Sequence, residues 1–312
     1  MGVERRHALA SAALGRGPAP RPATAPRSAT SVVTGEVLDI SPHLLILENP
    51  DGVEERLVIA PWATAWYGAA IPPAEIPAGS RVVVRATQAG RVVDRVWAAV
   101  TRVTGVILAL GRERRDRTIE VDCGPHRGRR VAVIPYGASG RIRVRFPKLE
   151  PGYLFDAIGT RVNGVTYARL PATSQPPYRA TAVPPPPPGY GGVQSRISGT
   201  AGWSDAFDEG ETGAAYPMLE RADSGCDDAG VSCAALPYLA LGSRLHVENT
   251  CAGQAATVPI VTCGCMAGRY CDRCVECGTS PRGRVVELSP ASFVELGGDL
   301  ANGCFNARIG LG

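Results

Sequence analysis

The sequence predicts a mainly β protein built from several small barrels, and three observations support this prediction. The chain of 312 residues contains 37 Gly and 27 Pro but only 6% aromatic residues, which favours many short strands and turns over long helices. Two blocks of about 70 residues repeat one alternating pattern. Nine of the ten cysteines lie between Cys226 and Cys304, which marks a separate C-terminal unit.

The repeated blocks are residues 31–100 and 101–170. They begin with VVTGEVLDI and RVTGVILAL, so that Gly35 and Gly105 are 70 residues apart. Each block contains about five short alternating segments separated by Gly and Asp/Asn turns. This pattern fits a small closed barrel of the oligonucleotide/oligosaccharide-binding (OB) type, and it resembles repeated β-barrel modules of bacterial surface proteins. The blocks are expected to be binding or spacer modules, with purely structural barrels as the alternative.

Two segments have the composition of unfolded chain. Residues 1–30 are rich in Pro, Ala and Arg and are expected to be disordered, although Arg5-Arg6 before a weakly apolar stretch resembles a short secretion signal. Residues 171–196 are expected to be a linker, in which Pro184–Pro188 predict an extended polyproline II rod. No run of 18 apolar residues occurs, so no transmembrane segment is expected.

The two halves of the chain carry opposite charge. Residues 1–180 contain 25 Lys and Arg against 15 Asp and Glu, whereas residues 181–312 contain 8 against 14. A basic first half suits an anionic partner such as a wall polymer, a lipid headgroup or a nucleic acid. A well-solvated Arg-rich surface is the alternative interpretation.

The dense cysteines predict a disulfide framework and therefore an oxidising, extracytoplasmic compartment. The candidates are Cys226, Cys233, Cys251, Cys263, Cys265, Cys271, Cys274, Cys277 and Cys304. Their pairing cannot be read from the sequence, and the odd number leaves one thiol over, which could stay free, pair with Cys123 or pair between chains. Zinc is the alternative, because Cys263, Cys265, Cys271, Cys274 and Cys277 have C-x-C and C-x2-C spacings that suit a thiolate site. Apart from this alternative, no cofactor is expected.

The C-terminal unit, residues 197–312, has its own order of elements. Strands are expected at 244–248, 284–288 and 304–309, with a short helix at 290–296. Local sequence signals predict both ends of this helix: Ser289 can cap it, Pro290 suits its first position, and Gly297-Gly298 ends it.

Four segments of this unit resemble the double-psi β-barrel domain of the rare lipoprotein A family and of expansins. They are GTAGW, LPYLALGSRLHVEN, GRVVELSPASFVELGG and GCFNARI, and together they span about a third of the chain. The resemblance implies a six-stranded double-psi barrel with one or two short helices after the two OB-like barrels. It also implies a partner among cell-wall polysaccharides, peptidoglycan in particular.

The resemblance further implies a catalytic carboxylate. Glu287 stands where the family has an essential aspartate at a strand end, and it is expected to face an open groove as proton donor. Glu276 matches a second acid of the expansin pattern, with Asp272 as an alternative, and Asp205 falls where related endoglucanases keep their base. The substitution of Glu for Asp, and the lack of a His before the Leu-Pro, weigh against simple transglycosylase activity.

Aromatic side chains are expected to line the sugar groove by stacking on pyranose rings. The candidates are Trp203, Tyr238 and Tyr270, of which Trp203 is the strongest because the family's aromatic residue there borders the cleft. Packing in the core is the alternative for each of them.

The sequence therefore predicts an exported, cell-wall-associated protein that binds peptidoglycan or another polysaccharide, and that cleaves or loosens it if Glu287 is active. Whether it is an enzyme is left open, with lytic transglycosylase or expansin-like action as the candidate activities. A non-catalytic structural or binding protein is one alternative. A cytoplasmic zinc protein that contacts nucleic acid through its basic half is the other.

Overall fold

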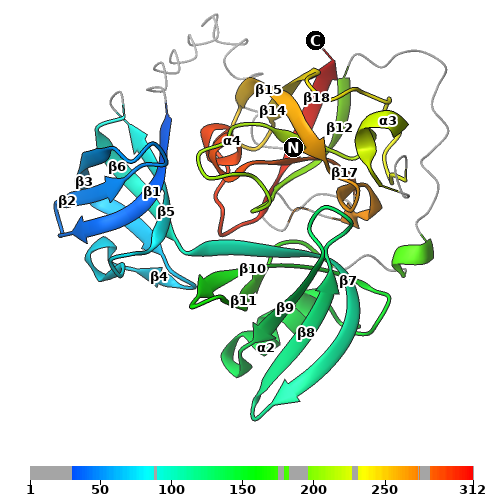
Figure 1. Cartoon of the computed structure of the whole chain (residues 1–312), viewed down its shortest axis with the longest axis horizontal. Coiled ribbons are helices and arrows are strands. Elements are labelled where there is room, and N and C mark those ends of the chain that lie inside the picture. Colours follow the sequence, from blue (N-terminus) through cyan, green and yellow to red (C-terminus); the bar gives the residue numbers. More distant parts are fainter. Residues whose placement is uncertain are drawn as a thin grey trace, which may run out of the picture.

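The computed structural model describes residues 30–87, 90–174, 179–182, 196–226, 231–272, 274 and 282–311. Their strands form three sheets, and each sheet closes into a barrel (Figure 1), so the prediction of a mainly β protein is confirmed. In this part of the chain, no helix combines the length and the apolar character needed to cross a membrane. The expected secretion signal and the run of five prolines lie outside the described residues.

The first barrel contains six strands and one 3-10 helix. They are β1 (Ser31–Ile40), β2 (Leu44–Glu48), β3 (Glu54–Trp66), β4 (Ala70–Ile71), η1 (Pro73–Glu75), β5 (Arg81–Thr87) and β6 (Val92–Ala98). The strand order is β2-β1-β5-β6-β3-β4, and pairing of β2 with β3 closes the sheet. Of these pairs only β3–β6 is parallel, which gives the five long strands the order of an OB barrel.

The second barrel repeats this arrangement. Its elements are β7 (Val100–Glu113), β8 (Asp116–Asp122), β9 (Arg129–Ile134), α2 (Tyr136–Arg145), β10 (Leu154–Val162) and β11 (Val165–Pro171), followed by η2 (Ala180–Ala182). The closed order is β10-β11-β9-β8-β7, with β9–β11 as the parallel pair. Gly35 and Gly105 occupy matching places, because a Cβ on either would collide with the carbonyl oxygen that ends the second strand, Glu48 or Asp122. The sequence repeat is thus one topology used twice.

The third barrel contains seven strands and three short helices. They are β12 (Arg196–Trp203), β13 (Ala214–Tyr216), α3 (Arg221–Ser224), β14 (Arg244–Asn249), β15 (Gln254–Cys263), η3 (Ala267–Arg269), β16 (Cys271–Asp272), β17 (Arg282–Leu288), α4 (Pro290–Glu295) and β18 (Cys304–Leu311). The order is β12-β18-β14-β15-β13-β17-β16, and β12–β17 closes the sheet. Two pairs, β12–β17 and β13–β15, are parallel. The predicted helix is α4, where the Ser289 hydroxyl accepts from the Ser292 amide at 3.2 Å.

The first barrel packs on the third through an apolar contact. Trp66, Val83 and Trp97 belong to the same buried cluster as Trp203 and Phe293 of the third barrel. Helix α4 lies against β1 and β5. The core of the third barrel therefore continues without a polar break into the first.

Candidate functional site

Glu287, the predicted proton donor, lies at the interface between the second and third barrels. Its side chain is completely buried. Arg127, from the loop between β8 and β9, donates to Oε2 at 2.9 Å, and Arg284 of the same β17 strand donates to Oε1 at 2.9 Å. The strand end that was expected to face an open groove is covered by the second barrel.

The ion pairs continue from Glu287 into the second barrel. Arg284 donates to Asp156 Oδ2 at 2.6 Å, and Arg102 donates to both Asp156 oxygens at 2.7 and 2.6 Å. Arg102 also donates to the main-chain oxygens of Trp203 and Gly303. We call Arg102, Asp156, Arg284, Glu287 and Arg127 the buried charge network.

The network keeps both of its carboxyl groups ionised. Burial alone would raise the pKa of Asp156, but the charges of Arg102 and Arg284 outweigh it and hold that pKa well below the usual range. Burial alone would also raise the pKa of Glu287, but the charges of Arg127 and Arg284 outweigh it and lower that pKa. A general acid must carry a proton and reach the glycosidic oxygen, so Glu287 does not have the geometry of one in this structure.

The aromatic candidates occupy different places from those expected. Trp203 is fully buried and its indole donates to the Leu300 carbonyl at 3.0 Å. Tyr270 is also fully buried; its ring lies 3.9 Å from the Arg284 guanidinium and its hydroxyl donates to the Phe155 carbonyl at 2.7 Å. The prediction that Trp203 and Tyr270 line a sugar groove is therefore wrong. Trp203 belongs to the core of the third barrel, and Tyr270 lies at its interface with the second. Only Tyr238, 57% exposed, lies on the surface.

Asp205, the predicted base, is at the edge of the same interface. Arg130 of the second barrel donates to both of its carboxylate oxygens at 2.9 Å, and the Thr101 hydroxyl also donates to it. Unlike Glu287, it keeps some exposure and lines the groove described next. The other candidate acid, Glu276, lies outside the described residues.

A groove follows the junction of the three barrels. Its larger part, of about 500 Å³, is lined by residues of the first two barrels and by Asp205, and an adjoining part of about 140 Å³ runs between the first and third barrels. The two parts share Arg81, Val100 and Asp205. Each part contains one half-buried aromatic side chain, Tyr67 or Phe207. The groove therefore offers aromatic faces and hydrogen-bonding groups along one line.

The groove is lined by charges of both signs. Arg81 and Arg161 come from the first and second barrels, and Glu36 also comes from the first. Asp205, Asp208, Glu209 and Glu211 come from the third. Arg81 and Glu209 approach to 3.4 Å, which joins the two walls at one point. Groups of both signs can thus find a partner along the groove.

The cysteines form two arrangements among the described residues. Cys233 and Cys271 form a disulfide. The sulfur of Cys265 lies within bonding distance of two others, Cys226 and Cys263. The alternative zinc set is corrected accordingly, because Cys271 is paired with Cys233 and the Cys274 sulfur lies 3.2 Å from the Cys304 carbonyl oxygen. Cys277 lies outside the described residues, so of the described members Cys263 and Cys265 lie together.

The interface residues were not predicted from the sequence. Arg102 and Asp156 lie on strands β7 and β10 at positions where the first repeat has Val32 and Val83. Aligning the two repeats would have revealed two opposite charges at positions that are apolar in the first copy. His126 and Arg127 give no comparable signal, because they belong to a loop without periodicity.

A scan against protein-family models and a search of the curated proteins found no match for this chain. The resemblance to the rare lipoprotein A and expansin domain therefore stays a prediction.

Proposed function

We propose that this chain is an extracytoplasmic protein that binds a cell-wall polysaccharide, peptidoglycan in particular, without cleaving it. The binding site is the groove at the junction of the three barrels. One observation carries the proposal: the carboxylate expected to act in catalysis is buried in ion pairs, while a separate groove that contains Asp205 presents half-buried aromatic rings and polar groups. The Cys233–Cys271 disulfide is consistent with an oxidising compartment.

Recognition of sugars follows from the residues that line the groove. Tyr67 and Phe207 each present an apolar ring face on which a pyranose can stack. Arg81, Arg161 and Asn163 supply donors for hydroxyl and carbonyl oxygens. The two parts of the groove adjoin, so that a chain of several sugars, rather than a single one, can occupy it.

Peptidoglycan suits the charges better than a neutral glucan does. Its peptide stems carry both carboxylates and amines, and the groove has both guanidinium groups and carboxylates along its length. A neutral polymer such as cellulose has no charged group to pair with either wall. We therefore expect binding to peptidoglycan to exceed binding to cellulose, and to weaken as the salt concentration rises.

The test is co-sedimentation of the purified full chain with peptidoglycan sacculi and with microcrystalline cellulose. The double variant Tyr67→Ala, Phe207→Ala is expected to lose about tenfold in affinity for sacculi, since two stacking contacts are removed. Tyr136→Ala is the matched control, because Tyr136 is an aromatic residue 65% exposed on α2 that does not line the groove. It is expected to bind as the parent does.

Two outcomes would overturn the proposal. Equal binding by the parent and the double variant would exclude the groove as the site. Release of soluble glycan fragments by the parent, and its loss in Asp205→Asn, would replace binding with cleavage.

A further inference from the structure

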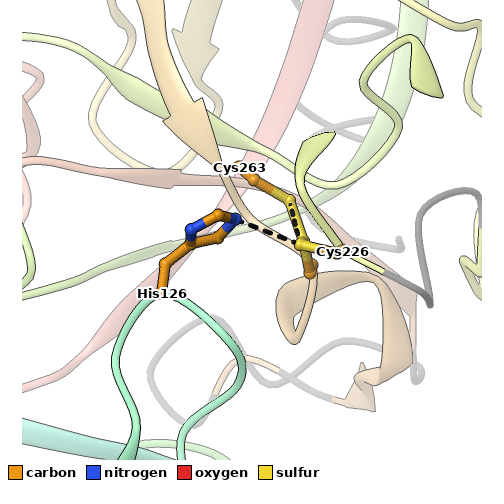
Figure 2. A group of neighbouring side chains, drawn as sticks. His126, Cys226 and Cys263 are labelled. Carbon is orange, nitrogen blue, oxygen red and sulfur yellow. Dashed lines mark hydrogen bonds between the residues drawn. A yellow bond between two sulfur atoms is a disulfide. The ribbon is translucent and has the colours of Figure 1, made fainter. Parts of the chain in front are cut away.

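Four side chains that commonly bind metals converge where the second barrel meets the third. His126 comes from the loop between β8 and β9, and Cys226, Cys263 and Cys265 come from the third barrel. One ligand atom of each lies within 4.8 Å of all the others. Figure 2 shows the imidazole of His126 pointing at the sulfurs of Cys226 and Cys263. His126 Nε2 is 3.3 Å from Cys226 Sγ, and that sulfur is 3.1 Å from Cys263 Sγ.

Disulfide bonding alone does not account for this convergence. Cys265 lies within bonding distance of both Cys226 and Cys263, but a sulfur atom forms only one disulfide. Either pairing leaves a third buried thiol beside an imidazole. A common centre uses all four groups, because a tetrahedral zinc site with Zn–S near 2.3 Å and Zn–N near 2.0 Å separates its ligand atoms by about 3.5–3.8 Å.

We propose that His126, Cys226, Cys263 and Cys265 bind one structural Zn²⁺ ion. All four positions of a tetrahedral ion are then filled by protein, which leaves no place for water or substrate and makes the site structural. On binding, the three thiols release their protons to solvent. His126 binds as the neutral tautomer that carries its proton on Nδ1, so Nε2 presents a lone pair to the ion and does not donate to the Ser224 carbonyl, which lies 2.8 Å from Nε2.

The backbone around the cluster is arranged for this approach. Gly225, next to Cys226, has φ +55°, and a Cβ there would lie 3.0 Å from Cε1 of His126. A side chain at this position would both strain the backbone and push the imidazole away. The residue therefore has to be glycine for the ring to reach the sulfurs.

Cys123 lies near the proposed ligands but is not one of them. Cys123 lines a small cavity together with His126, Cys263 and Cys265, but it is not among the four converging groups. The Cys123 thiol instead donates to the Val121 carbonyl of its own barrel, with the sulfur 3.8 Å from the oxygen. Cys123 is thus a matched control for the four ligands.

The proposed ion fastens two barrels together. His126 precedes Arg127 in the chain, and Arg127 pairs with Glu287. The same loop would then hold the third barrel by a coordination bond and by an ion pair from adjacent residues. This inference does not depend on glycan binding and stands or falls separately from it.

The test is the metal content of the full chain, purified under mild reduction without chelator and measured by elemental mass spectrometry. About one zinc per chain is expected for the parent and for Cys123→Ser. His126→Ala and Cys226→Ser are expected to hold zinc at least tenfold more weakly against a competing chelator. His126→Cys keeps four donors and is expected to retain the ion, which separates loss of a ligand from failure to fold.

A second measurement needs no variant. Replacing the ion with Co²⁺ is expected to give the visible absorption of a tetrahedral site and a near-ultraviolet band from thiolate ligands. The proposal is overturned if peptide mapping of the untreated parent finds Cys265 in a disulfide with Cys226 or Cys263. It is equally overturned if the parent contains no zinc, or if His126→Ala and Cys226→Ser retain it as firmly as the parent.

Discussion

The first and second barrels share one topology but place different groups at two matching positions that contact the third barrel. In the first, Val32 and Val83 pack against the buried apolar cluster of the third barrel. In the second, the matching positions are Arg102 and Asp156, both fully buried in ion pairs. Strand register shows that Val83 and Asp156 occupy equivalent positions, because Val83 pairs with Thr34 and Asp156 pairs with Thr104, the equivalent threonine of the second repeat.

The loops between the second and third strands of each barrel also differ in their polar contacts with the third barrel. In the first barrel this loop is a self-contained turn, in which the side-chain oxygen of Asn49 accepts from the amides of Asp51 and Val53. In the second barrel the loop is longer, and its His126 and Arg127 reach groups of the third barrel. The matching positions are thus apolar in one copy and charged in the other, while the first barrel has polar contacts elsewhere, from Arg81 to Glu209 and from Trp97 and Arg95 to Asp299.

Substitutions at the two kinds of position are expected to lower the free energy of unfolding by different amounts. An apolar contact loses stability gradually as surface is removed. A buried charge that loses its partner keeps the full desolvation penalty, so directed ionic contacts fail abruptly. The following predictions test this contrast, starting with the largest effect.

Arg284→Met is expected to lower the free energy of unfolding by about 3–5 kcal/mol, because Asp156 and Glu287 both lose a buried partner. Urea unfolding at pH 7 measures it. Arg308→Met is the control, since Arg308 is half-exposed and only 3.9 Å from Glu248, and it should cost under about 1 kcal/mol. Similar losses in both variants would show that the buried charge network has no special weight.

Val83→Asp places the residue type of the second barrel at the matching position of the first. The neighbouring Arg85 already pairs with Asp94, and Val83 belongs to the apolar cluster, so a loss of about 2–4 kcal/mol is expected. Val83→Ala, which removes only apolar surface, should cost less. Urea unfolding compares the three proteins. A Val83→Asp protein as stable as Val83→Ala would mean that this interface tolerates charge.

Acid is expected to loosen the second barrel's interface before that of the first. The folded-state pKa values of Asp156 and Glu287 lie below their unfolded values, so the unfolded chain binds more protons as the pH falls through about 4. The stability that these carboxylates supply is therefore present at pH 7 and is lost progressively below pH 4.

Amide hydrogen exchange of β10 and of β5, compared at pH 7 and pH 3 after correction for intrinsic rates, measures this difference. Protection should fall first in β10, which carries Asp156, since β5 has no carboxylate of its own that contacts the third barrel. An equal loss in both strands would contradict the assignment of the pH effect to the ion pairs.

Trp97→Phe should have the smallest effect, about 1–2 kcal/mol, because it removes one hydrogen bond and part of a buried ring but keeps an aromatic side chain in place. The Trp97 indole donates to Asp299 at 2.8 Å, and Asp299 keeps its ion pair with Arg95 at 3.2 Å. Thermal unfolding measures the change. A loss as large as that of Arg284→Met would show that the first interface also depends on a directed polar contact.

Much of the fold could be predicted because it depends on local signals. The repeat marked by Gly35 and Gly105 gave two similar barrels, and the cap at Ser289 gave helix α4 at its observed place. Glu287 was correctly placed at the end of a strand. What the sequence could not predict was the surface facing that strand end, since Arg127 is 160 residues away in the chain.

The sequence by itself determined the mainly β class, the duplicated barrel and the concentration of cysteine in the last third, because period, turn residues and composition act within a few residues of each other. Only the tertiary structure decided that Glu287 is buried, that His126 meets three cysteines, and that a groove opens where three barrels join. Each of these depends on how separately folded surfaces cover one another, and contacts of that kind leave no pattern along the chain.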